Sequence, residues 1–595
     1  MNKKPTNHRL GTFFIALLAF VPLFTSCVDI EPGEVLDYKH AYTDVDAADA
    51  AIRGLYGQFM SLADRVVVLN ELRADLMDVT PYATTDLQEI NVSRPSEKNV
   101  WADVTPFYQV IQSCNDILFN FNTMLNDNRM NKAEYSERYS DVAALRTWVY
   151  LQLGIHFGRV PYITAPTVTL SDLDKNNASE LDLDALIVEL ISCMEALPTL
   201  ENYKSSPLIQ NNVDGYSLKP FFIDKRCLLA DLYLYDNRYQ EAATLYRQVL
   251  ATDEELVAGN KDADRKYRIY CSTWTSSVSP DWYQILYQDG RGNDENGMTN
   301  FWREMFAGVA GSQRASWEHI WFFTYDNRYE PKFTLRKLFD PVSDKGNYYL
   351  KPSEYVVDEL WGAEMQQNGF PFDVRGITGA YEKIGGENYI RKYSYFDVYP
   401  SGTAKGGWFL YRAAMLNLRY AEAANRAGYP KLAWAIVNNG LFGSMFDFKK
   451  ADGSAYPGDS VKISGDSPFE PYPFPYNFDA RYTDSPVRIR GAWRGHGGIR
   501  GRANLTNVNF PDNLATKDDS IHFVEKLIVH EAALELAFEG HRWEDLIRVA
   551  RRMNKENAGS GDKFLWDENI AKKYKNSAVA ADLSSNDKWF LPIYK

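Results

Sequence analysis

Residues 219–252 read KPFFIDKRCLLADLYLYDNRYQEAATLYRQVLAT. Ala230 and Ala242 are small positions of this stretch, and Tyr233, Tyr246 and Val249 are large ones. Small side chains let two antiparallel helices approach closely, while the large ones pack each pair against the next. The stretch therefore predicts a helical hairpin that stacks on further hairpins.

The same five side chains match the pattern of a tetratricopeptide repeat. With Ala230 at position 8 of that roughly 34-residue unit, the other four occupy repeat positions that call for a small or a large side chain. Glu254 stands where the repeat usually has proline. A weaker unit occupies 408–441 and a further helical hairpin occupies 521–553, so helical pairs are scattered along the chain.

Other segments have the three- and four-residue apolar steps of amphipathic helices. They are 47–62, 101–125, 138–157 and 181–197. We therefore predict a mainly α fold, a single domain over 27–595 built on a tetratricopeptide-like scaffold. The scaffold covers about 41–254, 407–441 and 519–555.

Two long insertions, 255–406 and 442–518, separate the scaffold segments. They are rich in Gly, Pro, Asn and aromatic residues and contain short β-like runs such as 319–325 and 388–396. Irregular segments carried by a rigid scaffold are where binding surfaces usually lie. The insertions are therefore expected to be partly β and to carry ligand specificity.

The N-terminal residues predict export. Lys3, Lys4 and Arg9 precede an apolar run over 10–24, which ends shortly before Cys27. This is the order of a secretory signal, and the run is too short for a bilayer that needs about 20 apolar residues. The end resembles a lipobox, with Phe24 in place of the usual leucine. We expect cleavage of 1–26 and acylation of Cys27, with an ordinary secretory signal as the alternative.

Charge and cysteine content exclude other classes of protein. Loss of 1–26 removes three positive charges, so the formal net charge changes from −14 to −17, and such a field disfavours nucleic acid as a partner. Cys114, Cys193, Cys227 and Cys271 form no C-x-x-C pair. The first three lie in helical patterns, which favours buried thiols over disulfides or a metal site.

Catalytic signatures are missing from the sequence. His530 and Glu531 begin like H-E-x-x-H, but Leu534 stands at the position of the second histidine. No nucleophile elbow, phosphate loop or dinucleotide fingerprint occurs in a fitting context. We therefore expect a protein that is not an enzyme and needs no cofactor, with calcium at 290–297 as an open alternative.

Aromatic residues are concentrated in the first insertion. Six of the fourteen tryptophans lie within 88 residues, together with Tyr283, Tyr287, Tyr325 and Tyr329. Those tryptophans are residues 274, 282, 302, 317, 321 and 361. A sugar ring presents C–H groups that stack on an aromatic face, beside polar groups that bind its hydroxyls. Trp274, Trp282, Tyr283 and Trp302 are candidate ligand contacts, whereas Trp321 is expected in the core.

A cluster of basic residues precedes the last hairpin. The loop 488–502 contains five arginines, at 488, 490, 494, 500 and 502, together with His496. It is either a solvated loop or a surface for anionic lipid, an acidic rim or a charged sugar.

Several segments together resemble the SusD/RagB family of outer-membrane nutrient-binding lipoproteins. They include the helix and turn at 139–164, the hairpin at 219–252, the segment KPSEYVVDELWG with the Asp373, Arg375 and Arg391–Lys392 that follow, and Tyr420–Ala424. The strongest match is HEAALELAFEGHRWEDLIR at 530–548. Ala532 stands where the family usually has arginine, and the arginine-containing turn lies at 499–505.

The resemblance implies a glycan-binding lipoprotein of the cell outer membrane, lipid-anchored and facing outward. It further implies a lid role over a SusC-type TonB-dependent transporter that imports oligosaccharide. It points to the turn after the first helices, with Asp75 and Tyr82, and to Arg303, as ligand contacts. Peptide capture and a structural tetratricopeptide adaptor are the alternatives.

Overall fold

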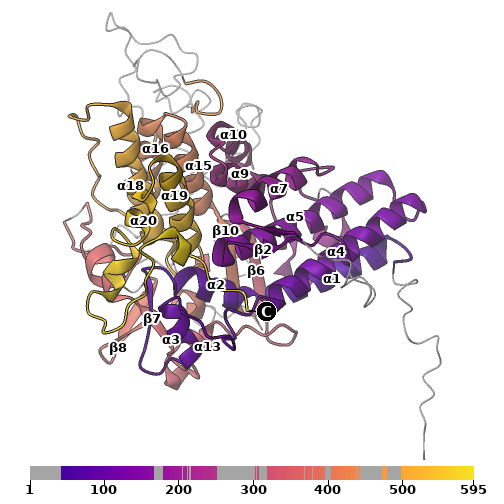
Figure 1. Ribbon diagram of the computed structural model, residues 1–595, viewed down its shortest axis with the longest axis horizontal. Helices are drawn as coiled ribbons and strands as arrows, with labels where there is room; N and C mark the ends of the chain where they lie inside the picture. Colours follow the sequence, from indigo (N-terminus) through magenta and orange to yellow (C-terminus); the bar gives the residue numbers. More distant parts are fainter. Residues whose placement is uncertain are drawn as a thin grey trace, which may run out of the picture.

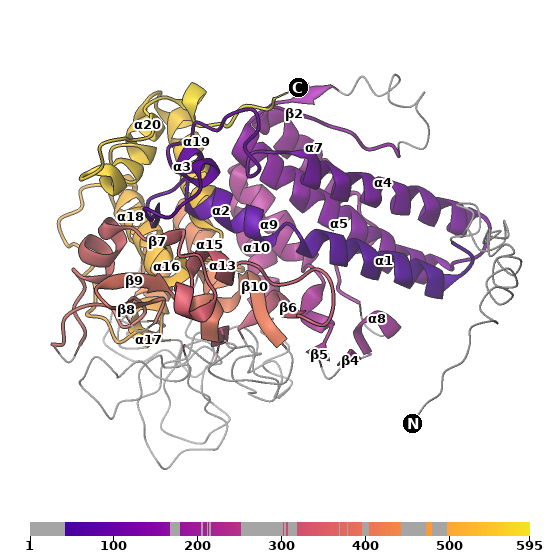
Figure 2. The same ribbon diagram turned by 90° about the horizontal axis from the view of Figure 1, so that it is seen from below.

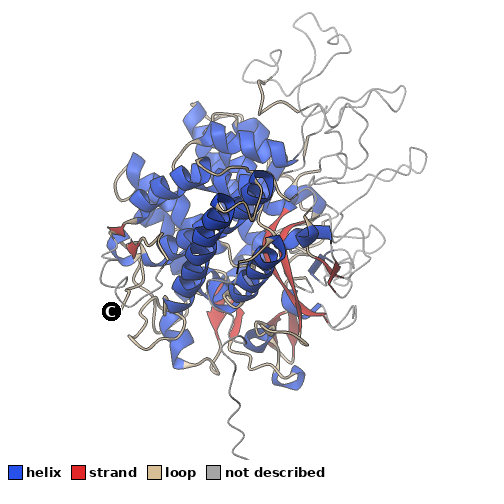
Figure 3. Cartoon of the chain, turned by 90° about the vertical axis from the view of Figure 1, so that its right-hand side faces the viewer, coloured by secondary structure: helices blue, strands red, loops and turns tan. Residues whose placement is uncertain are grey.

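The computed structural model describes fourteen stretches of the chain. They are 42–166, 179–203, 206–210, 212–213, 216–250, 302, 305–306, 318–367, 369–377, 379–395, 404–438, 440–441, 472–478 and 497–594. Helices dominate these stretches and the strands are short, which confirms the predicted mainly α class (Figure 3). None of the described helices combines the length and apolarity needed to cross a membrane.

The first helices lie side by side and form one arm of the molecule (Figures 1 and 2). They are α1 (Val45–Met60), α4 (Thr105–Asn126), α5 (Lys132–Phe157) and α7 (Leu183–Glu195). Each matches a predicted segment. Side-chain caps fix several of their starts: Asp44 accepts the Ala47 N–H of α1, and Asn131 forms a capping box with Glu134 in α5.

Three further hairpins stack beside this arm. They pair α9 (Lys225–Tyr235) with α10 (Tyr239–Leu250), α15 (Ala413–Arg426) with α16 (Pro430–Val437), and α18 (Lys517–Leu536) with α19 (Arg542–Glu556). Ala230, Ala242 and Tyr246 are fully buried between helices. The tetratricopeptide-like reading of 219–252 is therefore confirmed.

The remaining described helices are shorter. They are α2 (Ala63–Glu71), α3 (Thr85–Asn91), α8 (Pro207–Gln210), α13 (Arg336–Phe339), α17 (Ile499–Arg502), α20 (Ser560–Leu565) and the turns η2 (Lys219–Phe221), η5 (Val342–Asp344), η6 (Tyr355–Trp361), η7 (Lys392–Ser394), η10 (Ile570–Tyr574) and η11 (Asn586–Lys588).

The described strands form antiparallel pairs. They are β6 (His319–Asp326) with β10 (Ala404–Arg412), β1 (Met77–Val79) with β7 (Leu350–Pro352), β8 (Tyr381–Ile384) with β9 (Glu387–Ile390), β2 (Val160–Pro161) with β3 (Glu180–Leu181), and β4 (Asn212–Val213) with β5 (Tyr216–Ser217). β6 is the strand expected at 319–325, and the first insertion is partly β as predicted.

Two boundaries differ from the prediction. The β-like run at 388–396 is extended only as far as Ile390, after which the chain turns into η7. Residues 408–412 belong to β10, so the helical pair expected from 408 begins at Ala413. All five side chains of 408–412 are buried, and a run that is buried on both faces has no alternation to distinguish strand from helix.

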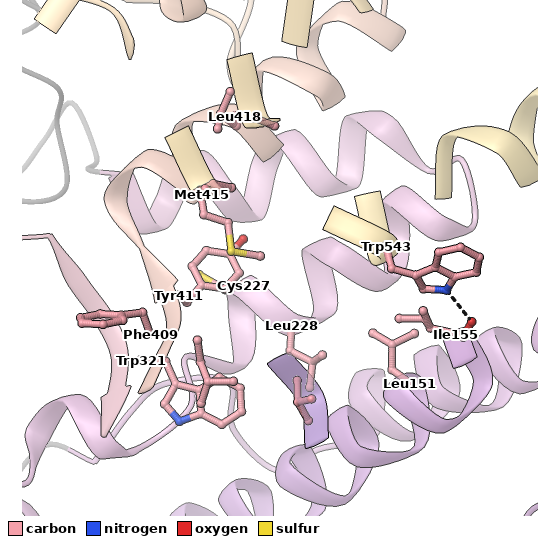
Figure 4. Close-up of a cluster of buried hydrophobic side chains, with 14 of the residues drawn as sticks. Leu151, Ile155, Cys227, Leu228, Trp321, Phe409, Tyr411, Met415, Leu418 and Trp543 are labelled. Atoms are coloured by element: carbon pink, nitrogen blue, oxygen red, sulfur yellow. Dashed lines mark hydrogen bonds between the residues drawn. The ribbon is translucent and has the colours of Figure 1, made fainter. Parts of the chain in front are cut away.

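The β6–β10 pair contributes aromatic side chains to the core beneath the first helices. Trp321 of β6 stacks on Phe59 of α1, with ring centroids 5.5 Å apart, and donates its indole N–H to the Phe221 carbonyl at 3.0 Å. Trp321 is thus a core residue, as predicted. The same core continues past Cys227 to Trp543, which donates to the Ile155 carbonyl (Figure 4).

Asp64, in the first turn of α2, provides a test of this packing. Burial raises the pKa of its carboxyl to about 6. The hydrogen bond from the Thr334 hydroxyl and the charge of the nearby Lys337 lower this pKa, but their effect is smaller. The folded state therefore resists ionisation of Asp64, and its stability falls as pH rises from about 4 to about 6.

Asp64→Asn removes this titration and keeps an acceptor for Thr334. We expect the variant to gain about 2 kcal/mol relative to the parent between pH 4.5 and pH 7.5. Urea unfolding of both proteins at a series of pH values measures the difference, because the groups they share cancel. A difference that stays flat with pH would contradict a raised pKa of Asp64.

Candidate functional site

A network of buried charges lies along one face of α18. Glu531, Glu535 and Glu539 are spaced four residues apart, so they project from the same side of the helix and its end. Glu535 binds three guanidinium groups: Arg375 at 2.8 Å, Arg412 at 2.7 Å and Arg502 at 2.5 Å. Arg375 also binds Glu531 and Asp373, while Arg412 and Lys392 bind Glu539.

The network connects the irregular segments to the helical scaffold. Arg375 and Lys392 come from the first insertion, Arg412 from β10 and Arg502 from α17. Burial opposes ionisation of Glu535, but Arg502, Arg412 and Arg375 hold its pKa well below the usual range. Its members are almost fully buried, so the network holds the fold together and offers no group to a ligand.

The arginines of 499–505 are part of this interior. Arg502 binds Glu318 and Glu535, and Arg500 binds Glu364 and Glu531. The expectation of a solvated or ligand-binding loop is therefore wrong for these two residues. Charge alone predicts that Arg500 and Arg502 are exposed to solvent. Their acidic partners lie up to 184 residues away in sequence, so no local pattern reveals them.

A second buried cluster joins residues 71–75 to the turn between α18 and α19. The Glu71 carboxylate accepts backbone N–H groups of Phe538, Gly540 and His541 at 2.8–3.0 Å. Phe538 and Gly540 have positive φ angles of 70° and 92°. This left-handed turn points its N–H groups at one spot, where a carboxylate satisfies them.

Asp75 belongs to the same cluster. Its two carboxylate oxygens each lie 2.7 Å from Arg542, and the side chain is fully buried. The structure thus uses Asp75 as an internal ion-pair partner, in contrast to the expected contact with ligand hydroxyls. The reason is that the loop after α2 is covered by the α18–α19 turn, which no local pattern reveals.

Trp302 is also internal. Its side chain is fully buried, its ring lies 5.0 Å from that of Phe306, and the Lys392 ammonium lies 4.9 Å from it. The expected exposed platform is therefore not observed at this residue. Its polar neighbours suggested exposure, whereas the spacing Trp302, Met305, Phe306 is that of a helix with one buried face.

Tyr82 is the predicted contact that the structure leaves accessible, with 68% of its surface exposed. Its ring lies 6.4 Å from that of Tyr348, which in turn lies 4.2 Å from that of Tyr389. We call these three side chains the tyrosine ledge. Tyr348 is buried between its neighbours, so the accessible ring surface belongs to Tyr82 and, in part, to Tyr389.

Backbone hydrogen bonds fix the position of Tyr82. Thr80 directly follows β1. Its N–H donates to the Tyr349 carbonyl at 2.9 Å, and its hydroxyl donates to the Tyr348 carbonyl. The Tyr82 N–H donates back to the Thr80 hydroxyl at 3.2 Å. The β1–β7 pair thus sets the positions of Tyr82 and Tyr348.

The β8–β9 hairpin supplies the third ring and polar groups. Gly385 and Gly386 both have positive φ, the conformation that a two-residue hairpin turn requires. The Tyr348 hydroxyl donates to Glu387 at 3.0 Å and to the Asn388 carbonyl at 3.2 Å. Burial and, to a lesser extent, the Glu387 carboxylate raise the pKa of Tyr348 above the physiological range. The Tyr348 hydroxyl therefore keeps its proton and remains a hydrogen-bond donor.

This arrangement can bind a ligand that presents a flat C–H face and hydroxyl groups. Tyr82 offers the face, and the exposed Glu387 and Lys383 flank the hairpin side of the ledge. No local pattern points to Tyr348 or Tyr389, because their place in the ledge depends on pairing between segments more than 260 residues apart.

Other predicted contacts lie outside the described residues. They are Cys27, Trp274, Trp282, Tyr283, Arg303 and the segment 290–297. Within the described stretches, no group of three or more His, Cys, Asp or Glu side chains is arranged to hold a metal ion. Cys114 and Cys227 are buried thiols and Cys193 is partly buried, as expected; burial raises the pKa of Cys114 to about 12.

Comparison with known proteins gives a consistent picture. The sequence profile of the SusD family matches residues 498–595, which contain α17 to α20 and most of the acidic partners of the buried network. No curated protein matches the chain in sequence.

Solved structures match over almost the whole chain. A SusD superfamily protein from Bacteroides vulgatus has a TM-score of 0.53 at 16% identity, with 92% of this chain and 95% of that one covered. Surface glycan-binding protein A from Bacteroides uniformis has a TM-score of 0.52 at 15% identity, with 92% and 95% covered. A laminarin-binding SusD-like protein has a TM-score of 0.51 at 14% identity, with 93% and 96% covered.

At these identities the structural matches establish the fold, and the profile match covers the segment on which the buried network is built. The chain thus has the fold of SusD superfamily proteins, and its residues 498–595 match the profile of the SusD family.

Proposed function

We propose that the protein is a surface lipoprotein that captures oligosaccharides and passes them to a SusC-type TonB-dependent transporter, which it covers as a lid. The observation that carries the proposal is the tyrosine ledge. Tyr82 is 68% exposed, so it contributes little to the core, and it lies beside Tyr348, which in turn contacts Tyr389. Such an exposed ring suits stacking with a sugar.

Two of the similar structures support this choice of ligand. One is called a surface glycan-binding protein and the other a laminarin-binding protein. In the proposal, Trp274, Trp282, Tyr283 and Arg303 of the first insertion complete the site. The role is binding without catalysis.

The proposal places the chain at the outer membrane through acyl groups on Cys27. Several acyl chains on one residue give firm attachment, because each buried methylene contributes about 0.8 kcal/mol. Cys27→Ser should release the protein from washed membranes, and protease treatment of intact cells should degrade the parent protein if it faces outward.

Tyr82→Ala tests the ledge. We expect about a tenfold loss of affinity for the oligosaccharide that binds the parent, which corresponds to about 1.4 kcal/mol of lost stacking. The melting temperature should stay within about 2 °C of the parent, because an exposed side chain contributes little to stability. Isothermal titration against a panel of neutral and acidic oligosaccharides measures the affinity.

Tyr594→Ala is the matched control. Tyr594 is also an exposed tyrosine, at 44%, but its hydroxyl binds Pro95 and it is not part of the ledge. It should bind sugar as the parent does. Equal affinity of parent and Tyr82→Ala would remove the ledge from the site, and binding of peptides with no oligosaccharide response would favour the peptide-capturing alternative.

A further inference from the structure

A cavity lies between α1, the η2 turn and the end of β6, apart from the tyrosine ledge. Its volume is about 290 Å³. Its lining includes six large side chains: Tyr56, Met60, Phe221, Phe222, Tyr325 and Tyr329. These segments lie together in Figure 2, where β6 runs beside the end of α1. The exposed Tyr329, at 55%, places the cavity mouth at the surface.

The inner wall presents carbon surfaces and few polar atoms. The Tyr56 hydroxyl donates to Asp141 at 2.9 Å, and the Tyr325 hydroxyl donates to the Met60 carbonyl at 2.7 Å. Because both hydroxyls are engaged inside the protein, the two tyrosines contribute ring surface to the cavity. A sugar, whose hydroxyls need partners, would leave them unsatisfied here.

The cavity size indicates the size of its ligand. An apolar cavity of about 150 Å³ accommodates one benzene molecule. A volume of 290 Å³ therefore has room for about two rings. The aromatic walls favour a planar group, which can stack on or meet the edges of the surrounding rings.

Charges at the mouth favour a negative substituent on that group. Asp326 binds Arg328 at 2.8 Å, and Glu330 lies 3.4 Å from Lys332, so both acids have a basic partner. Arg53 is exposed on α1, at the mouth, and no carboxylate in the described part of the chain pairs with it. Among the described residues, Arg53 is therefore a positive charge at the mouth that has no acidic partner.

We infer that this cavity is a second binding site, which takes a small anion with a planar aromatic body of about two rings. The inference does not depend on sugar binding at the tyrosine ledge. The two sites use different chemistry, since one offers an exposed ring with polar neighbours and the other a mainly apolar pocket that opens to the surface.

Gly57 of α1 makes the inference testable. It lines the cavity, and a Cβ atom built on it meets nothing within 4 Å. In Gly57→Leu the new side chain should occupy the cavity, while the helix gains up to about 1 kcal/mol from losing a glycine. Gly54→Leu is the matched control: the same change in the same helix, also without a clash, at a residue that does not line the cavity.

Two fluorescent dyes serve as probes. 8-Anilinonaphthalene-1-sulfonate has an aromatic body and a sulfonate, and N-phenyl-1-naphthylamine is its neutral counterpart. The parent and Gly54→Leu should bind both, while Gly57→Leu should lose about tenfold or more in affinity for each. Arg53→Gln should weaken the sulfonate dye by up to about fivefold and leave the neutral dye unchanged, as expected for one exposed charge.

Far-UV circular dichroism should be alike in all four proteins and no variant should unfold at a lower temperature than the parent, which excludes dye binding to a partly unfolded chain. The inference is overturned if the parent binds neither dye or if Gly57→Leu binds them as Gly54→Leu does. An equal loss of both dyes in Arg53→Gln would overturn the preference for an anion. Oligosaccharide affinity should be the same in Gly57→Leu and the parent, so failure of one site leaves the other testable.

Discussion

Glu535→Gln is expected to lower the free energy of unfolding by about 3–5 kcal/mol, the largest effect of any single change we consider. The carboxylate of Glu535 binds Arg375, Arg412 and Arg502 in a fully buried site. An amide in its place removes the negative charge that the three guanidinium groups share. The NH2 group of the amide also faces guanidinium N–H groups, and two hydrogen-bond donors cannot bind each other. A loss of this size is a large part of the 5–15 kcal/mol typical of a folded domain.

Urea unfolding, or soluble yield where the variant does not fold, measures this loss. Asp518→Asn makes the same carboxylate-to-amide change on the same helix at an exposed residue, and it should cost no more than about 1 kcal/mol. If Glu535→Gln were as stable as Asp518→Asn, the network would not be what holds the insertions against α18.

Asp75→Asn is expected to cost a similar amount, because it breaks the paired contacts to Arg542 and leaves a buried guanidinium without its counter-charge. Arg542 keeps its hydrogen bonds to the Val529 carbonyl and to Asn569, which limits the loss. Thermal unfolding of parent and variant gives the size of the effect.

Asp75→Asn also separates two roles that the sequence cannot distinguish. A contact to ligand would reduce affinity without reducing stability, whereas an internal ion pair does the reverse. We expect the folded fraction of Asp75→Asn to bind oligosaccharide as the parent does, while Tyr82→Ala shows weak binding at full stability. If the Asp75→Asn protein were stable but had lost affinity for the oligosaccharide, Asp75 would be a ligand contact after all.

The helical hairpins were predictable because their information is local. Ala230, Ala242 and Tyr246 recur at helical spacing, and the caps at Asp44 and Asn131 depend on residues two or three positions away. The strand at 404–412 was missed in part because WFLYR is buried on every side and has no two-residue alternation.

The site was harder to predict because its geometry depends on contacts between distant segments. Tyr82 was identified, but its neighbours Tyr348 and Tyr389 meet it only through the β1–β7 and β8–β9 pairs. Asp75 and Arg502 are acidic and basic residues whose local surroundings suggest solvent. Their partners, Arg542 and Glu318, lie 467 and 184 residues away.

Several hydrogen bonds join residues 72–156 to residues 573–591. Arg73 donates to the carbonyl of Trp589, Lys573 to that of Leu72, and the Leu591 N–H to that of His156 at 2.8 Å. The bond from Arg73 to Trp589 joins residues 516 apart in sequence, and closing so long a loop costs entropy before the contact repays it. Arg73 meets Ser93 and His156 over much shorter loops, so we expect the contacts to residues 573–591 to form late in folding and to fasten the first helices last.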